Sequence, residues 1–134
     1  MIATSGGADG FRSGTYDLVR VLREVNVMPC RPIVVVSYDY PQTPDGSKDF
    51  LAQADRLIKE VLGIPGVLEY RAYYNADGAS PLATSVLVCD TVENICASRH
   101  VFPRFLFEMR AHGATNIGVQ ILAPSPQYPD PIRR

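Results

Sequence analysis

The sequence has little net charge, and this shortage excludes one class of partner. Its 13 basic and 14 acidic side chains leave a formal charge of −1 at pH 7, and Lys and Arg form no stripe along the chain. Phosphate backbones bind to clustered Lys and Arg, so nucleic acid is not an expected partner. The short basic end, Arg133 and Arg134, is expected to be solvated.

Cysteines are also few. The three of them, Cys30, Cys89 and Cys96, form no Cys-x-x-Cys pair, which argues against a disulfide scaffold and against a zinc site built from thiolates. Cys89 falls in an apolar strand and Cys96 on the apolar side of a predicted helix. Both are therefore expected to pack as small buried hydrophobes. Reduced thiols are typical of cytoplasmic proteins, and we predict that location.

Long apolar runs are absent as well. Charged residues interrupt the N-terminal region, which therefore lacks the plan of a signal peptide, and no stretch is long enough to span a bilayer. Apolar residues make up 46% of the 134 residues and charged residues 20%. That balance is typical of a single soluble globular domain.

What the sequence does contain is an ordered succession of elements flanked by two irregular ends. We predict an N-terminal extension over residues 1–31, a folded domain over 32–123 and a Pro-rich tail over 124–134. Residues 16–27 of the extension have roughly helical apolar spacing and predict a short extra helix, although their valines also suit a strand. The four prolines of the tail favour an extended chain.

Within the domain, alternating and helical periodicities predict six elements. Strands are expected over 33–40, 68–75, 82–89 and 116–122, a helix capped by Ser47 over 48–62, and a second helical region from 92 to about 112. Pro103 fits the first turn of a renewed helix, so a break is expected near His100. The order is the split βαβ plan of the ferredoxin-like fold, an α+β fold with a four-stranded antiparallel sheet and two helices on one face.

The first predicted strand is apolar on both faces, as Val34-Val35-Val36 shows. Two helices on one face of the sheet would leave the other face in water. A twofold copy of the same sheet is the simplest cover, so we predict a homodimer. The alternative is that residues 1–28 or the tail cover this face in a single chain.

The segment from Pro32 to Leu122 resembles the dimeric α/β barrel superfamily. The resemblance rests on the order of elements, on Ile64-Pro65-Gly66-Val67 at the end of the first helix, and on His100 in the second helical region. Members include stress-responsive barrel domains, antibiotic-biosynthesis monooxygenase-type domains, and small polyketide and olivetolic acid cyclases. The resemblance implies a homodimer formed through the open sheet face, and a small hydrophobic oxygenated ligand.

The resembling cyclases use a histidine in the second helical region, which makes His100 the candidate acid or base. A phenol in a cavity can hold a carbonyl or an incipient oxyanion, so Tyr38 and Tyr70 are the other candidate catalytic residues. Tyr40, Arg71 and Arg99 are candidates for substrate binding. The ordinary alternatives are that His100 is a surface histidine, that the tyrosines are half-buried strand residues, and that Arg71 belongs to a plain cross-strand pair.

Two functional hypotheses stay open at this point. One is a cofactor-free cyclase, isomerase or monooxygenase, and the other is a non-enzymatic stress-responsive or ligand-binding dimer. A third reading concerns assembly: several copies of the chain could pair through their sheet edges into larger rings. No cofactor is expected, since His100 and His112 are the only histidines available as haem ligands, and two distant histidines predict no metal site.

Overall fold

The computed structural model describes residues 30–134, of which 31–123 form one compact unit. Residues 1–29 of the predicted N-terminal extension, including its helix over 16–27, lie outside the described residues. Cys30 and residues 124–134 belong to a second unit, in which the Cys30 N–H donates to the Pro129 carbonyl at 3.0 Å. Residues 124–134 contain no helix or strand. Between residues 30 and 134, no helix combines the length and the apolar character needed to cross a bilayer.

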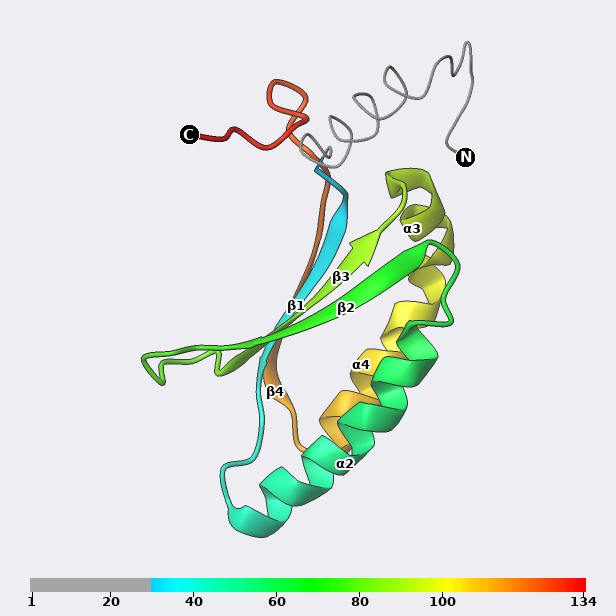
Figure 1. Ribbon diagram of the computed structural model, residues 1–134. Coiled ribbons are helices and arrows are strands. Elements are labelled where there is room, and N and C mark those ends of the chain that lie inside the picture. Colours follow the sequence, from blue (N-terminus) through cyan, green and yellow to red (C-terminus); the bar gives the residue numbers. More distant parts are fainter. Residues whose placement is uncertain (1–29) are drawn as a thin grey trace, which may run out of the picture. The chain divides into compact units, whose positions relative to one another are not determined.

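The folded unit is built on a four-stranded antiparallel sheet (Figure 1). Its strands are β1 (Ile33–Asp39), β2 (Val67–Tyr74), β3 (Ala83–Cys89) and β4 (Thr115–Leu122), in the order β2-β3-β1-β4. The strand that is apolar on both faces, β1, lies in the interior of the sheet and pairs with β3 and β4. This order and the helices described next confirm the predicted ferredoxin-like α+β fold.

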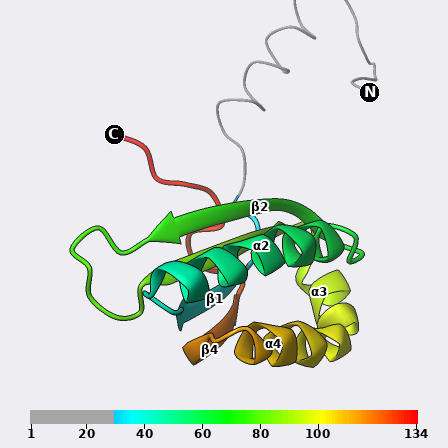
Figure 2. The ribbon, with the colours of Figure 1, turned by 90° about the horizontal axis from the view of Figure 1, so that it is seen from below.

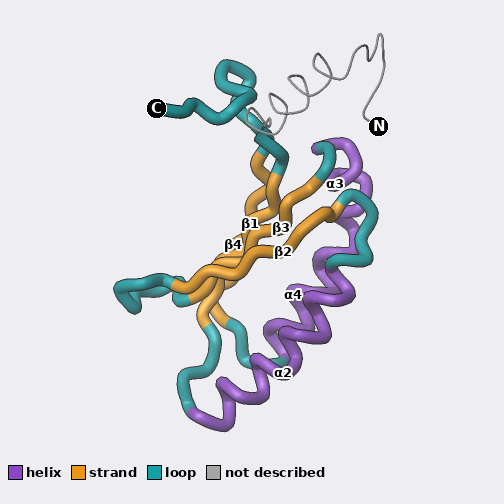
Figure 3. Tube along the Cα trace, viewed as in Figure 1, coloured by secondary structure: helices purple, strands orange, loops and turns teal. Residues whose placement is uncertain are grey.

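Helical segments cover one face of the sheet, as Figures 2 and 3 show. Helix α2 (Pro44–Val61) connects β1 to β2. Between β3 and β4 come α3 (Val92–Ser98), a single 3-10 turn η1 (Arg99–Val101) and α4 (Phe102–Ala111). The 3-10 turn confirms the break predicted near His100, and Pro103 lies in the first turn of α4, where its missing N–H costs no hydrogen bond.

Helix α2 begins four residues earlier than the sequence pattern suggested. The predicted cap was Ser47, whereas the cap is Thr43, whose hydroxyl accepts from the Gly46 N–H at 3.2 Å. Pro44 follows at the first helical position, where its fixed φ suits a helix. The Pro44-Asp45-Gly46 stretch reads as a loop by composition, but the cap and the proline together make it the first helical turn.

The core lies between the helices and the sheet. Ile95, Val34 and Cys89 are its most buried side chains, and Leu87, Phe105 and Leu57 pack around them. A second cluster joins Tyr38, Phe50, Ala83 and Ala114. The expectation for Cys89 is confirmed, but that for Cys96 is wrong: Cys96 is exposed, because Ile95 rather than its neighbour faces the sheet.

The second strand carries an irregularity that the alternation of its residues does not reveal. Its register with β3 shifts between Val67 and Glu69, the mark of a β-bulge. As a result Val67 is buried and pairs with Cys89, while Leu68 is 52% exposed. Beyond the bulge the pairing with β3 is regular, and Tyr70 pairs with the core residue Leu87.

Candidate functional site

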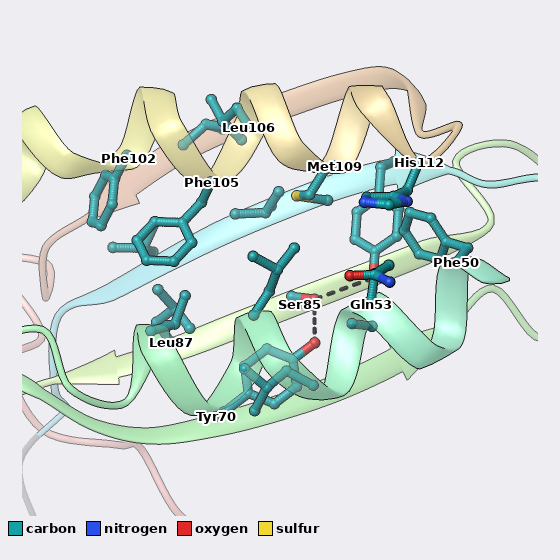
Figure 4. A pocket seen from close by; sticks show the side chains of 18 residues that line it. Phe50, Gln53, Tyr70, Ser85, Leu87, Phe102, Phe105, Leu106, Met109 and His112 are labelled. Carbon is teal, nitrogen blue, oxygen red and sulfur yellow. Dashed lines mark hydrogen bonds between the residues drawn. The ribbon is translucent and has the colours of Figure 1, made fainter.

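A cavity of about 90 Å³ lies between the sheet and the helix pair (Figure 4). Its wall comes from β1, β2, β3, β4, α2 and α4, so every layer of the folded unit contributes. Most of the lining is aliphatic or aromatic. The polar exceptions among the lining residues are Tyr38, Tyr70, Ser85, Gln53 and His112.

Three hydroxyl groups meet at the sheet side of this cavity, and we refer to Tyr38, Tyr70 and Ser85 as the hydroxyl cluster. The Tyr70 hydroxyl lies 2.6 Å from Ser85 Oγ, and the Tyr38 hydroxyl lies 3.4 Å from the same atom. They come from three neighbouring strands, and Ser85 on β3 stands between the two tyrosines. Burial raises the pKa of Tyr38, which therefore stays a neutral phenol at physiological pH.

His112 brings an imidazole to the same cavity from the helix side. It caps the C-terminus of α4, and its ring is among the cavity-lining groups labelled in Figure 4. Its Nδ1 lies 3.2 Å from Asp49 Oδ2 on α2. Within residues 30–134 the other ring nitrogen, Nε2, has no hydrogen-bond partner, so it is available to a molecule in the cavity.

His100, the histidine that the sequence favoured, does not line this cavity. It is exposed on η1, and its Nδ1 lies 3.0 Å from the Ala97 carbonyl oxygen. It lies beside a separate hollow formed with Ser98, Glu60 and Arg104. The structure therefore brings the candidates Tyr38 and Tyr70 together, and the histidine that lines the cavity with them is His112, not His100.

The three predicted substrate-binding residues lie outside the cavity lining. Tyr40 stacks on Phe50, with ring centroids 5.3 Å apart. Arg71 is exposed and pairs with Glu69, two residues away on the same strand, rather than across to a neighbouring strand. Arg99 is exposed on η1. Tyr40 thus supports the cavity from behind Phe50, whereas the two arginines do not contribute to it.

A ring of ion pairs joins the two helices that cover the cavity. Arg56 on α2 contacts Glu60 and Glu108, each at 2.8 Å, and Arg104 on α4 contacts Glu60 at 2.9 Å and Glu108 at 3.0 Å. Because each charge touches two of opposite sign, the four side chains hold one another in place. The Arg104 guanidinium lowers the pKa of Glu60, and Arg56 adds to this effect. We call this set the α2–α4 ion-pair ring.

Other polar groups have structural roles. Asp39, at the end of β1, accepts from Ser80 Oγ and from the Leu82 N–H, which lowers the pKa of its carboxyl and fastens the loop before β3. Among the described residues no group of His, Cys, Asp and Glu side chains is arranged to hold a metal ion.

Two members of the site, His112 and Ser85, were missed by sequence reasoning. His112 was considered as one of two distant histidines that predict no haem or metal site, so the sequence did not indicate that its ring reaches the cavity. Ser85 pairs with Ala72 and Val36 in the middle of the sheet. A serine in an apolar strand was the available signal for a buried hydroxyl. Comparison with protein-family models and with curated proteins finds no match to this sequence.

Proposed function

We propose that the protein binds a small hydrophobic molecule carrying oxygen and acts on it as a cofactor-free cyclase, isomerase or monooxygenase-type enzyme. The observation that carries the proposal is the cavity between the sheet and helices α2 and α4. It is apolar except for a few converging polar groups, the composition typical of small-molecule sites. The hydroxyl cluster lies on one side of it and His112 on another.

The chemistry that suits these groups is proton transfer next to a carbonyl. Nε2 of His112 would take a proton from the carbon beside the carbonyl, and the electron pair of that C–H bond would move to the carbonyl oxygen as an enolate. The hydroxyl cluster would donate to the enolate oxygen. Asp49 would stabilise the imidazolium until the proton returns at another atom. An enolate is also the nucleophile of an intramolecular ring closure.

The proposal includes the assembly implied by the dimeric α/β barrel resemblance. On the sheet face away from the helices, Val35 pairs with Val86 and Ile33 with Val88, which gives an apolar strip along the two interior strands. A second copy of the same sheet would cover this strip. Size-exclusion chromatography with light scattering should give a dimer mass. Val86→Arg should give a monomer, whereas Leu51→Arg, at a position 54% exposed on α2, should not.

A deuterium-exchange assay tests the catalytic part of the proposal. Acetophenone, a small aryl ketone, is incubated with the protein in D₂O, and the loss of its methyl protons is followed by NMR. The wild-type protein should accelerate exchange, and His112→Gln should reduce the protein-dependent rate by about 100-fold or more. The His100→Gln variant tests the competing assignment. Equal rates in wild type and His112→Gln would refute the role given to His112.

A non-enzymatic ligand-binding dimer is the second candidate. It is favoured by one observation: the hydroxyls of the cluster already bond to one another, and His112 already pairs with Asp49, so the polar groups also serve the fold. The same assay separates the two candidates. Saturable binding of acetophenone without any protein-dependent exchange would support a binding module and contradict an enzyme that acts on this ketone.

A further inference from the structure

We infer that the cavity selects an uncharged molecule that presents a hydrogen-bond acceptor of the carbonyl type to the hydroxyl cluster of Tyr38, Tyr70 and Ser85. This inference rests on the proposed function, because it specifies which molecules the same cavity takes. It is carried by a count of protons in the cluster, by the absence of charge in the described lining and by the size of the cavity.

The hydroxyl cluster has one proton more than its two contacts to Ser85 use. Three hydroxyl groups carry three protons, and the two contacts to Ser85 Oγ lie at 2.6 and 3.4 Å. Each contact uses one proton, whichever oxygen is the donor. The third O–H is on Ser85 if both tyrosines donate, and on Tyr38 or Tyr70 if Ser85 donates to it. Within the cluster, the interaction left for a tyrosine proton is the weaker one between the hydroxyls of Tyr38 and Tyr70.

The spare donor always lies on the cavity wall, because all three residues line the cavity. Tyr38 is 9% exposed and Ser85 8% exposed, whereas Tyr70 is half-buried. A buried donor with a poor acceptor is costly. A ligand oxygen with a lone pair offers this donor a better acceptor. Because burial raises the pKa of Tyr38, the phenol keeps its proton and can donate it.

The lining also determines which charge the ligand can carry. None of the 18 described residues that line the cavity is Asp, Glu, Lys or Arg. The one ring that can gain a proton, His112, already faces the Asp49 carboxylate. A buried ion without a counter-charge is strongly disfavoured. The cavity therefore favours neutral molecules over carboxylates and amines of the same shape.

The volume limits the size of the ligand. An apolar cavity of about 150 Å³ holds benzene, so about 90 Å³ favours a small molecule of about the size of one ring. Acetophenone, a single ring with one carbonyl substituent, is a probe at the upper end of this range. The aromatic side chains Phe50, Phe102 and Phe105 in the wall suit such a ring.

Three probes with the same number of non-hydrogen atoms test the inference: acetophenone, its hydrocarbon counterpart α-methylstyrene, and the anion benzoate. Their affinities for the full-length protein are measured by NMR titration. We expect benzoate to bind at least about 10-fold more weakly than acetophenone. Benzoate binding as tightly as acetophenone would overturn the preference for a neutral molecule.

The triple variant Tyr38→Phe/Tyr70→Phe/Ser85→Ala removes the donors. It should lower the preference for acetophenone over α-methylstyrene by about 3–10-fold, the effect of one neutral hydrogen bond. The control Tyr73→Phe/Tyr74→Phe removes two phenols of β2 that do not line the cavity and should leave the preference unchanged. An unchanged preference in the triple variant, with α-methylstyrene still bound, would overturn the inference and leave the binding cavity standing.

Failure of every probe to bind wild type would overturn the proposed function together with the inference.

A measurement on the wild type alone covers the case in which the triple variant does not fold. The carbonyl carbon of acetophenone labelled with carbon-13 should move downfield on binding, relative to its shift in a hydrocarbon solvent, because the oxygen accepts a hydrogen bond. A bound shift equal to the hydrocarbon value would show that the cluster does not donate to it.

Discussion

Replacing Gly66 by Ala should destabilise the fold, because this residue joins two segments at a crowded point. Gly66 has φ of +93°, and its carbonyl accepts from the Asp90 N–H at 2.9 Å. A Cβ there would lie 2.9 Å from Asn94 Cβ and 3.0 Å from Asp90 Oδ1. The left-handed backbone costs about 1–2 kcal/mol for an L residue, and overpacking about 1–3 kcal/mol. The expected loss is therefore about 2–5 kcal/mol.

Gly78→Ala is the matched control for this substitution. Gly78 also has a positive φ, +76°, but a Cβ there would meet no atom within 4 Å. Gly78→Ala should therefore lower the free energy of unfolding only by the cost of the left-handed backbone, about 1–2 kcal/mol. The free energy of unfolding of both variants is measured by urea unfolding, followed by circular dichroism at one protein concentration. The slope of this free energy against urea concentration should be the same in both variants and in wild type, as a check on cooperativity. Equal losses in the two variants would refute the argument that packing around Gly66 determines its identity.

Three further predictions concern the core, the helix pair and the thiols. Ile95→Ala should lower the free energy of unfolding by about 2–5 kcal/mol, since Ile95 is fully buried, whereas Cys96→Ala should change it by about 0.5 kcal/mol or less. Because the pKa of Glu60 is lowered in the folded state, its contribution is present above the ordinary value of 4.5 and is lost as the pH falls through the folded-state pKa. The melting temperature of Glu60→Gln should thus lie below that of wild type at neutral pH, and the difference should shrink as the pH falls through the lowered pKa of Glu60; a difference that stays constant with pH would contradict the ion-pair ring. Iodoacetamide should modify Cys96 in the native protein but Cys89 only after unfolding, because burial shields Cys89 and raises the pKa of its thiol; mass spectrometry that finds Cys89 modified as fast as Cys96 would contradict this placement.

The architecture could be predicted because its signals are local. The apolar run of β1, the amphipathic spacing of α2 and the proline at the start of α4 each point to one kind of element, and their order leaves few topologies. The start of α2 was misplaced because two residue types that normally mark loops, Pro44 and Gly46, here follow a threonine cap. The exposure of Leu68 could not be predicted, because a bulge is set by pairing with β3 and leaves no mark in the alternation of β2.

The sequence indicated the candidate site only in part. It named Tyr38 and Tyr70 as candidates on two different strands, because side chains on a strand alternate regularly, but it did not show that the two share a face of the sheet. The directions of His100 and His112 depend on the 3-10 turn between α3 and α4. Such a turn has fewer residues per turn than an α-helix, so it changes the direction in which every later side chain points from the helix axis. This turn leaves His100 exposed, while His112, at the far end of α4, reaches the cavity. The pairing of His112 with Asp49 depends on how α2 and α4 cross, which the sequence pattern does not determine.

The central claim is that the cavity under α2 and α4 takes a small uncharged oxygenated molecule, and Met109 gives the most direct test. It lines the cavity, and the other two methionines of the chain lie outside the described residues. The protein is labelled with carbon-13 on its methionine methyls, the Met109 signal is assigned with Met109→Leu, and acetophenone is titrated in. A saturable shift of the Met109 signal is the predicted result. A signal that stays unchanged up to the solubility limit of acetophenone would contradict the account.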